Sequence, residues 1–402
     1  MIYRARTVVS MDGPPIDNGA VAVADDRIVD VGRFEVVRRA QGGEAIDLGE
    51  VALMPGLVNA HCHLDFTSLR GKIPAERSFA DWIRQINAKR RELSEEDFLA
   101  SIAAGFAEAR KWGTTTITNV ESVPQLLRRM LPPPLRTWWF LELIDVRASA
   151  LPDELVEAAM SLGKLTSNWP GGFGLSPHAP FTTSPRLSQL AAEHDVPVTM
   201  HIAESREEMQ MFRDGSGPLY DLLQSLGRPM NDCGAGRTPL ATMLARQQLD
   251  ERWIVVHLNE LTEDDFSQLA RGPRFHIAHC SRSGRYFQHS PFALHRLRGL
   301  GFNICLGTDS LASNSSLSLF SEMRAVRAAH PSLSAREILE MVTLNGARAL
   351  QRTGCLGKIA PGCFADLIAL PIASAAADLF EQIIEWREPV DWLLTGGIPS
   401  PV

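Results

Sequence analysis

The sequence has little cysteine and no regular cysteine spacing. Six cysteines occur in 402 residues, and none belongs to a CxxC pair: Cys62, Cys233, Cys280, Cys305, Cys355 and Cys363. In a chain of this length, scattered cysteines indicate reduced thiols rather than a disulfide framework. This usage is typical of a cytoplasmic protein.

Long hydrophobic runs are also missing. No apolar stretch approaches the length of a membrane span, and the first residues, MIYRARTVVSMDG, lack the apolar core of a secretion signal. We therefore expect a cytoplasmic protein without a membrane partner.

An excess of positive charge is absent as well. The chain has 40 lysines and arginines against 47 aspartates and glutamates, a formal net charge of −7. This balance argues against a nucleic-acid partner and favours a small-molecule substrate. The sequence leaves the oligomeric state open, with a homodimer as one hypothesis.

The chain is rich in apolar residues, at 45%, which is enough for a large domain and a smaller one. Near the N-terminus, strand patterns at residues 7–9, 20–23 and 28–32 are separated by polar turns. These strands are too few for an independent domain, but residues 362–370 form a further strand pattern. We predict a small composite β domain from residues 1–53 and 354–402.

Residues 54–353 alternate between strand and helix patterns. An apolar run over residues 51–58 leads into His61-Cys62-His63, and helices are expected at 94–112 and 334–350. Seven more strand patterns follow the first, at residues 114–120, 136–143, 172–176, 196–201, 253–257, 274–278 and 302–306. Eight strands alternating with helices over roughly 300 residues predict an α/β fold, the (β/α)8 TIM barrel.

Possible metal ligands stand where four of these strands end. His61 and His63 share one face of an extended strand. His201 ends the fifth strand, His257 ends the sixth, and Asp309 follows the eighth. Because catalytic residues of a TIM barrel lie at the C-terminal strand ends, this pattern predicts a metal site. The alternative, a pair of surface loop histidines, does not explain the later residues.

These strand ends resemble the amidohydrolase superfamily. The similar segments are PGLVNAHCH at 55–63, SPHAP at 176–180, HIAES at 201–205, HL at 257–258, HCSRS at 279–283 and GTDS at 307–310. The resemblance extends from Leu53 through Asp366. It implies a metal-dependent hydrolase that acts on C–N bonds.

The resemblance implies that one divalent metal, Zn²⁺ or Fe²⁺, is bound by His61, His63, His201 and Asp309. Superfamily members with two metals usually bridge them through a lysine at the end of the fourth strand. That strand reads GGFGLSPHAPF here and has no lysine, so we expect a single metal. His279, although followed by Cys280, is not assigned as a ligand.

The same resemblance gives Glu204, His257 and Asp309 catalytic roles. Glu204 lies three residues after His201, where deaminase-like members place a carboxylate that shuttles protons. His257 would orient the attacking water, and Asp309 would accept its proton. The alternative for Glu204 is a carboxylate favoured by the N-terminus of the following helix.

Within the superfamily, these features resemble the deaminase and chlorohydrolase branch. HLDF at 63–66, residues 79–83 and HCSRSGRYF at 279–287 are most similar to aminofutalosine deaminases of menaquinone biosynthesis. Those enzymes convert a 6-aminopurine nucleoside that carries a benzoate into its 6-oxo form. The resemblance makes His178 a substrate contact.

Aromatic and basic side chains supply further candidate contacts. Phe66 and Trp82 could stack on a purine, and Arg70, Arg282 or Arg285 could pair with the benzoate. Other substrates stay open: cytosine, guanine, an adenosine derivative or a triazine. So do a cyclic-amide hydrolase, which the absent lysine disfavours, and a non-catalytic metal-binding protein. The remaining histidines, among them His289, have no motif context.

Overall fold

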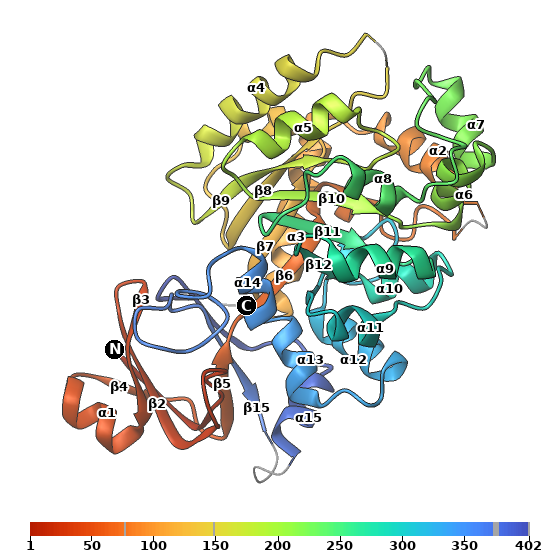
Figure 1. Ribbon diagram of the computed structural model, residues 1–402. Helices are drawn as coiled ribbons and strands as arrows, with labels where there is room; N and C mark the ends of the chain where they lie inside the picture. The colour runs from red at the N-terminus through yellow and green to blue at the C-terminus, as the bar shows by residue number, and fades with distance from the viewer. Residues whose placement is uncertain (76–77, 148, 373–377, 401–402) are drawn as a thin grey trace.

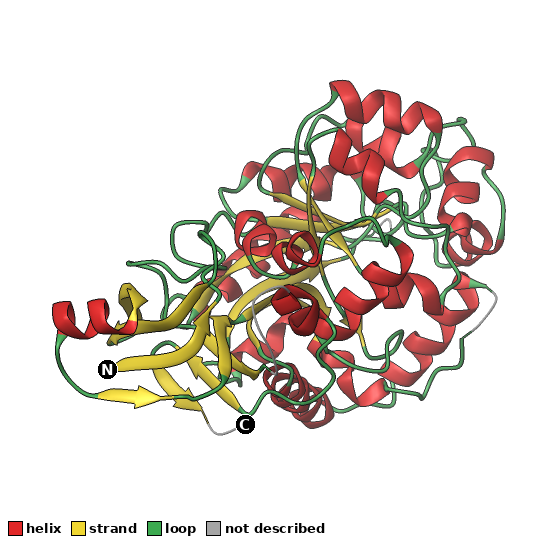
Figure 2. Cartoon of the chain, turned by 90° about the horizontal axis from the view of Figure 1, so that it is seen from below, coloured by secondary structure: helices red, strands yellow, loops and turns green. Residues whose placement is uncertain are grey.

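Two sheets organise the chain. The computed structural model describes residues 1–75, 78–147, 149–372 and 378–400. A barrel of parallel strands occupies the middle of the sequence, and a separate sheet takes strands from both ends (Figure 1). In Figure 2 both termini lie at this second sheet, away from the barrel. The predicted barrel with a composite β unit is confirmed.

The barrel sheet is parallel throughout, in the order β13-β12-β11-β10-β9-β8-β7-β6-β14. Its strands are β6 (Leu57–His63), β7 (Thr114–Glu121), β8 (Arg136–Leu143), β9 (Gly171–Pro177), β10 (Val198–Ile202), β11 (Trp253–His257), β12 (His276–His279), β13 (Asn303–Leu306) and β14 (Asp309–Ser310). The predicted strands at 136–143 and 253–257 match the observed bounds.

Helices surround this barrel (Figure 2). They are α2 (Phe79–Arg90), α3 (Glu95–Lys111), α4 (Pro152–Gly163), α5 (Pro185–Glu193), α6 (Arg206–Asp214), α7 (Pro218–Ser225), α8 (Pro239–Ala245), α9 (Glu263–Arg271), α10 (Ser281–Tyr286), α11 (Leu294–Gly299), α12 (Leu319–Ala329), α13 (Ala335–Met341) and α14 (Leu344–Ala349). Leu64–Leu69 form a 3₁₀ helix directly after β6.

The ring closes where the eighth strand is split. β13 pairs with β12, whereas β14 pairs with β6. Between them, Gly307 lies against β6 so closely that a Cβ would stand 2.7 Å from the Cβ of His61. Asn59 and Thr308 join the two strands through hydrogen bonds of 2.8 and 3.1 Å. This junction holds the end of the eighth strand beside His61.

The second sheet has eight strands and is mostly antiparallel. From the N-terminal part come β1 (Ile2–Val8), β2 (Ile16–Ala24), β3 (Arg27–Arg33), β4 (Ala45–Asp47) and β5 (Val51–Pro55), with α1 (Phe34–Gln41) between β3 and β4. The C-terminal part adds β15 (Leu367–Pro371), β16 (Trp392–Thr395) and β17 (Ile398–Ser400), with α15 (Leu379–Ile384) after β15.

The chain passes from one sheet to the other at Gly56. The apolar run over residues 51–58 belongs to two strands, β5 and β6, which are separated at Gly56. A Cβ on Gly56 would lie 2.2 Å from the side chain of Thr115, so only glycine fits the crossing. Its N–H donates to the carbonyl of Asp366 at 2.9 Å.

The predicted final helix over 334–350 is wrong in one respect. Its start is confirmed, because Ser334 and Glu337 form a capping box. The helix then breaks into α13 and α14 at Val342 and Thr343. The carbonyl of Val342 accepts a hydrogen bond from Val58 N (2.8 Å), so β6 takes an acceptor that a continuous helix would need.

A buried ion pair connects the barrel to the second sheet. Arg136, at the start of β8, donates from Nε to Asp366 Oδ2 at 2.8 Å, and both side chains are buried. Asp366 also accepts from Gly396 N at 2.7 Å, and the guanidinium of Arg136 lies 3.4 Å from the ring centroid of Phe364.

Arg136→Met should destabilise the fold. Breaking one partner of a buried pair leaves an uncompensated charge, which costs about 3–5 kcal/mol of unfolding free energy. Urea unfolding followed by tryptophan fluorescence measures the loss. Arg186→Met, which removes an exposed pair with Asp153, is the control and should change the urea midpoint far less. Equal midpoints for the two variants would contradict the role given to Arg136.

All six cysteines are free thiols. Within the part of the chain that the structure describes, no helix is both long and apolar enough to cross a bilayer.

Candidate active site

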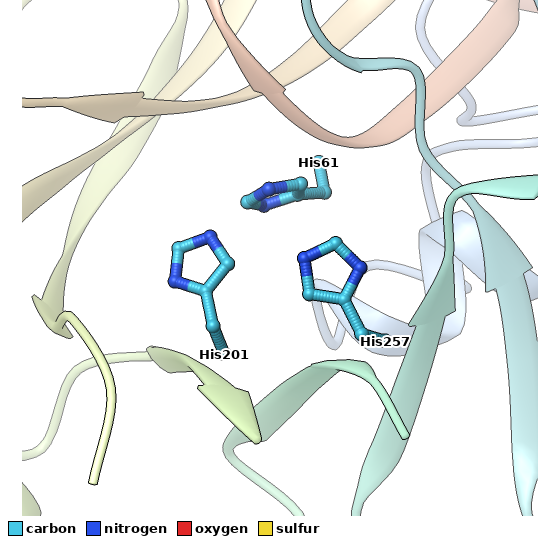
Figure 3. A group of neighbouring side chains, drawn as sticks. All are labelled: His61, His201 and His257. Carbon is cyan, nitrogen blue, oxygen red and sulfur yellow. The ribbon is translucent and has the colours of Figure 1, made fainter. Parts of the chain in front are cut away.

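Four imidazoles and a carboxylate converge at the carboxyl ends of the barrel strands. His61 and His63 come from β6, His201 from β10, His257 from β11 and Asp309 from β14. Because these strands run parallel in one ring, their carboxyl ends lie on the same face of the barrel. The ring of His61 lies 4.9 Å from those of His63 and His201, centroid to centroid, and all five residues are buried. Figure 3 shows His61, His201 and His257 around a common centre.

The carboxylate of Asp309 completes this cluster. Its Oδ1 lies 3.8 Å from His61 Nε2 and 3.9 Å from His63 Nε2. One ligand atom from each of His61, His63 and Asp309 lies within 4.8 Å of the others, and so does one from each of His61, His201 and His257. These distances are longer than a hydrogen bond, and they match the distances between two ligand atoms that bind the same metal ion.

The hydrogen bonding of the histidines fits a metal. Neither ring nitrogen of His61 has a hydrogen-bond partner among the described residues, although the side chain is fully buried. His201 uses Nδ1 to donate to the carbonyl of His178 at 2.8 Å, which leaves the Nε2 lone pair free. Unpaired buried nitrogens are costly unless something binds them. Three imidazoles with a carboxylate suit Zn²⁺ or Fe²⁺.

Protonation states agree with this interpretation. Burial lowers the pKa of His61, His63 and His201, and the neighbouring imidazoles lower it further. Burial alone would raise the pKa of Asp309, but the adjacent histidines outweigh burial and the pKa is lowered. At neutral pH the site therefore presents neutral imidazoles and an ionised carboxylate, the forms that bind a metal.

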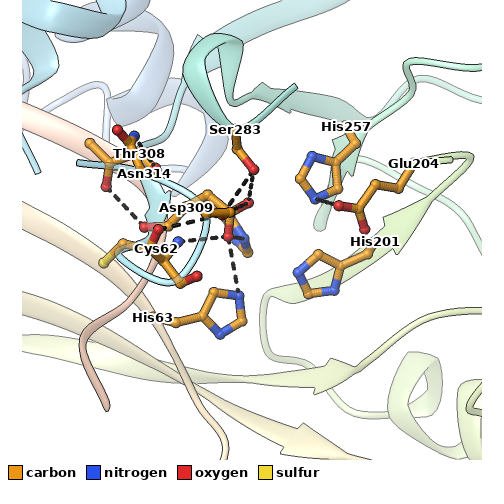
Figure 4. A network of polar contacts seen from close by, with 12 residues as sticks. Cys62, His63, His201, Glu204, His257, Ser283, Thr308, Asp309 and Asn314 are labelled. Carbon is orange, nitrogen blue, oxygen red and sulfur yellow. Dashed lines mark hydrogen bonds and ion pairs between the residues drawn. The ribbon is translucent and has the colours of Figure 1, made fainter. Parts of the chain in front are cut away.

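Hydrogen bonds fix the orientation of Asp309 (Figure 4). Ser283 Oγ, at the start of α10, donates to Oδ2 at 2.5 Å, and Ser310 N donates to Oδ1 at 2.7 Å. Ser313 Oγ lies 3.3 Å from the same Oδ2. Partners of this kind hold a metal ligand in place and tune its basicity.

Backbone strain is concentrated at the same residues. Asp309 has φ 57° and His257 has φ 77°, both in the left-handed region that disfavours residues other than glycine. Such a conformation costs of order 1–3 kcal/mol and persists only where the surroundings enforce it. The ring closure at Gly307 and the Ser283 hydrogen bond supply that enforcement at Asp309.

Glu204 lies beside the cluster, just after β10. Its Oε1 is 3.5 Å from His257 Nε2 and 3.9 Å from His289 Nε2. Burial raises the pKa of Glu204 to about 8. A carboxyl group that holds its proton near neutral pH can serve as a general acid.

A cavity of about 270 Å³ opens onto these residues. Three predicted substrate contacts line it: Phe66, Trp82 and His178. His178 lies just after β9, and its Nδ1 is 2.7 Å from Thr182 Oγ1.

The predicted arginines are not brought to this cavity. Arg70 pairs with Glu108 of α3 instead, because the 3₁₀ helix after β6 turns its side chain outward. Arg282 donates to Ser315 Oγ at 2.5 Å, and its backbone N–H donates to Glu322. Neither lines the cavity, and nor does Arg285; Arg90 does.

Several residues at the site were not predicted as site residues, and some of them bear charge or contact a predicted catalytic residue. Arg90 and Glu142 line the cavity, Ser283 binds Asp309, and His289 lies beside Glu204. The segment HCSRS at 279–283 contained a signal for Ser283. It directly follows the predicted strand at 274–278, so its hydroxyl groups are expected near the strand ends that also carry Asp309. For Arg90, the sequence offered only the run of three basic residues at 89–91, and such a run favours a solvent-exposed helix face.

Comparison with known proteins adds a family profile. The profile described as Amidohydrolase family matches residues 52–383. The match includes every residue of the metal cluster and Glu204.

Relatives that match over most of their length are named as deaminases. The 5-methylthioadenosine/S-adenosylhomocysteine deaminase of Nitratidesulfovibrio vulgaris is 31% identical over 397 residues, covering 93% of this chain and 84% of that protein. The aminodeoxyfutalosine deaminase of Deinococcus radiodurans is 27% identical over 354 residues, covering 83% and 81%. A crystal structure of an adenosine deaminase from Xanthomonas campestris with bound zinc has a TM-score of 0.84 at 26% identity, covering 100% of this chain and 92% of that one.

Proposed function

The chain belongs to the amidohydrolase family, and from that premise we propose that it is a metal-dependent deaminase of a 6-aminopurine nucleoside. The enzyme would hydrolyse the bond between C6 and the exocyclic amine and release ammonia. The observation that carries the proposal is Glu204, a buried acid with a raised pKa at the edge of a fitting metal cluster. Relatives named as deaminases of adenosine-like compounds support it.

The residues divide the proton transfers among them. A divalent metal held by His61, His63, His201 and Asp309 would lower the pKa of a water there to about 7. Glu204 would donate its proton to the purine ring nitrogen next to C6 while the oxygen of the activated water adds to C6.

Departure of the amine needs a second proton, which comes from the attacking water. Asp309 would accept one proton of this water, and that proton goes to the amine nitrogen as the C6–N bond breaks and ammonia leaves. The hydroxyl proton that remains on C6 goes to Glu204, which restores the acid and leaves a carbonyl at C6. His257 would orient the water from the end of β11. Its Nε2 lies 3.5 Å from Glu204 Oε1. The nucleoside retains an oxygen at C6.

The shape of the cavity favours a nucleoside over a free base. Beyond the metal cluster, its wall is formed by apolar side chains of α2 and α7. A pyrimidine or guanine base alone would leave this wall in contact with water, whereas a substituent on the ribose would cover it. Aminodeoxyfutalosine is our leading substrate. It leads because the segments at 63–66, 79–83 and 279–287 are most similar to aminofutalosine deaminases. S-Adenosylhomocysteine and 5′-methylthioadenosine are the alternative, supported by the relative named for them, which has the higher identity.

Ammonia release from metal-loaded protein tests the proposal. We expect turnover of aminodeoxyfutalosine or of an adenosine derivative, with kcat/KM above that for cytosine, guanine or an aminotriazine. Ammonia from cytosine or guanine but from no aminopurine nucleoside would refute the nucleoside assignment and leave a deaminase. No ammonia from any of these compounds, with metal loading verified, would refute the deaminase assignment.

A further inference from the structure

The outer part of the cavity combines an apolar wall with one cation. The wall is made by Phe79, Trp82, Ile83, Leu222, Leu223 and Leu226. Phe287 packs against it, with its ring 4.9 Å from that of Trp82. Among the described residues that line the cavity, Arg90 is the one arginine.

Arg90 lies one aromatic ring away from the metal cluster. It is the last residue of α2, and its guanidinium carbon is 5.3 Å from the ring centroid of Phe66. The ring of Phe66 is stacked on that of His63 at 5.7 Å and 14°. The ring of Phe66 therefore separates Arg90 from the metal cluster.

Most hydrogen-bond donors of Arg90 have no partner in the described chain. A guanidinium has five N–H donors, and Arg90 donates from Nη2 to Ser122 Oγ at 3.0 Å. Ser122 in turn donates to Asp65. This chain of contacts fixes the guanidinium and leaves its other N–H groups for a ligand.

We propose that Arg90 binds a carboxylate carried by the 5′ substituent of the nucleoside. The inference rests on the proposed function and narrows its substrate class to 6-aminopurine nucleosides with an anionic 5′ substituent. A planar guanidinium matches a carboxylate through two parallel hydrogen bonds. The apolar wall excludes water around such a pair, which strengthens it.

The acidic side chains near Arg90 do not occupy the position that we propose for the substrate carboxylate. Glu142 also lines the cavity, with Oε1 4.0 Å from His178 Nε2, and Asp65 is connected to Arg90 through Ser122. Among the described residues neither carboxylate forms an ion pair with Arg90 within 4.0 Å. The arginine therefore has charge to offer a substrate.

The test compares Arg90→Met with wild type on four nucleosides. Aminodeoxyfutalosine offers a benzoate and S-adenosylhomocysteine an amino-acid carboxylate, while 5′-methylthioadenosine and adenosine offer none. Methionine keeps much of the side-chain length and removes the charge. We expect kcat/KM to fall about tenfold or more, mainly through KM, on the carboxylate substrate that the wild type prefers. The neutral nucleosides should change less than about twofold.

Arg84→Met is the matched control, since Arg84 is an exposed arginine of the same helix that pairs with Asp81. It should leave all four values unchanged. In Arg90→Met, the anionic substrate with the larger loss of kcat/KM shows whether Arg90 binds the benzoate or the amino-acid carboxylate.

Two results would overturn the inference. Wild-type activity on nucleosides with an equal loss for neutral and anionic substrates in Arg90→Met would refute it alone. A wild type that deaminates none of the four would refute the proposed function and this inference with it.

Discussion

Glu204→Gln should keep its metal and its fold and lose turnover by about 10²–10⁴-fold, the usual contribution of a general acid–base group. Glutamine has nearly the shape of glutamate but cannot give up or accept a proton. Glu204 is the buried carboxyl beside His257, and burial keeps its pKa near 8. Steady-state ammonia release and metal analysis of the same sample measure both quantities.

Glu208→Gln is a demanding control for this prediction. Glu208 is also buried, and burial raises its pKa to about 8 as well. Its Oε2, however, accepts the backbone N–H of Glu204 at 2.7 Å, and the side chain does not line the cavity. Glutamine can still accept that bond, so this variant should retain most of its turnover. Near-normal kcat in Glu204→Gln would assign the proton transfer to another group, with His257 as the next candidate.

Asp309→Asn should abolish tight metal binding and, with it, activity. The amide removes the negative charge that complements the three imidazoles and gives the metal a weaker ligand. We expect an affinity loss greater than the 10–100-fold that follows removal of a partner that only orients a ligand. Elemental analysis after dialysis against a chelator measures the retained metal.

Ser283→Ala provides the graded comparison, because Ser283 only orients Asp309. Its affinity loss should stay within about 10–100-fold. Thermal unfolding gives a readout independent of activity: added Zn²⁺ should raise the melting temperature of the wild type by mass action. It should raise that of Asp309→Asn much less. Equal metal retention by wild type and Asp309→Asn would remove Asp309 from the ligand set.

The convergence of the histidines and Asp309 could be predicted from strand periodicity and the barrel rule, whereas the choice of ligands among them came from the resemblance to the amidohydrolase superfamily. His61 and His63 share a face of one strand, and parallel strands bring their carboxyl ends together. Local signals also predicted the start of α3 correctly, since Ser94 caps it through a capping box with Asp97.

The arginine of the cavity could not be predicted in the same way. Arg70 is close to His63 in sequence, but the 3₁₀ helix turns its side chain toward Glu108. Arg90 is distant in sequence and reaches the cavity only because α2 packs beside the barrel mouth with that face inward. Helix rotation is set by tertiary packing, which a charge run does not encode.

Tertiary contacts also explain the error in the bounds of the final helix. The break between α13 and α14 follows from the hydrogen bond that Val58 N donates to the carbonyl of Val342. This partner is remote in sequence, so local propensity favoured a continuous helix over 334–350.

Metal titration of the chelated protein tests the central claim most directly. Apo-protein should be supplied with Zn²⁺ in fractions of an equivalent, and ammonia release from an aminopurine nucleoside should be followed at each step. With His61, His63, His201 and Asp309 as the ligand set and no lysine at the end of β9, activity should rise linearly and saturate at one equivalent per chain. Saturation at two equivalents, or full activity without added metal, would contradict the account.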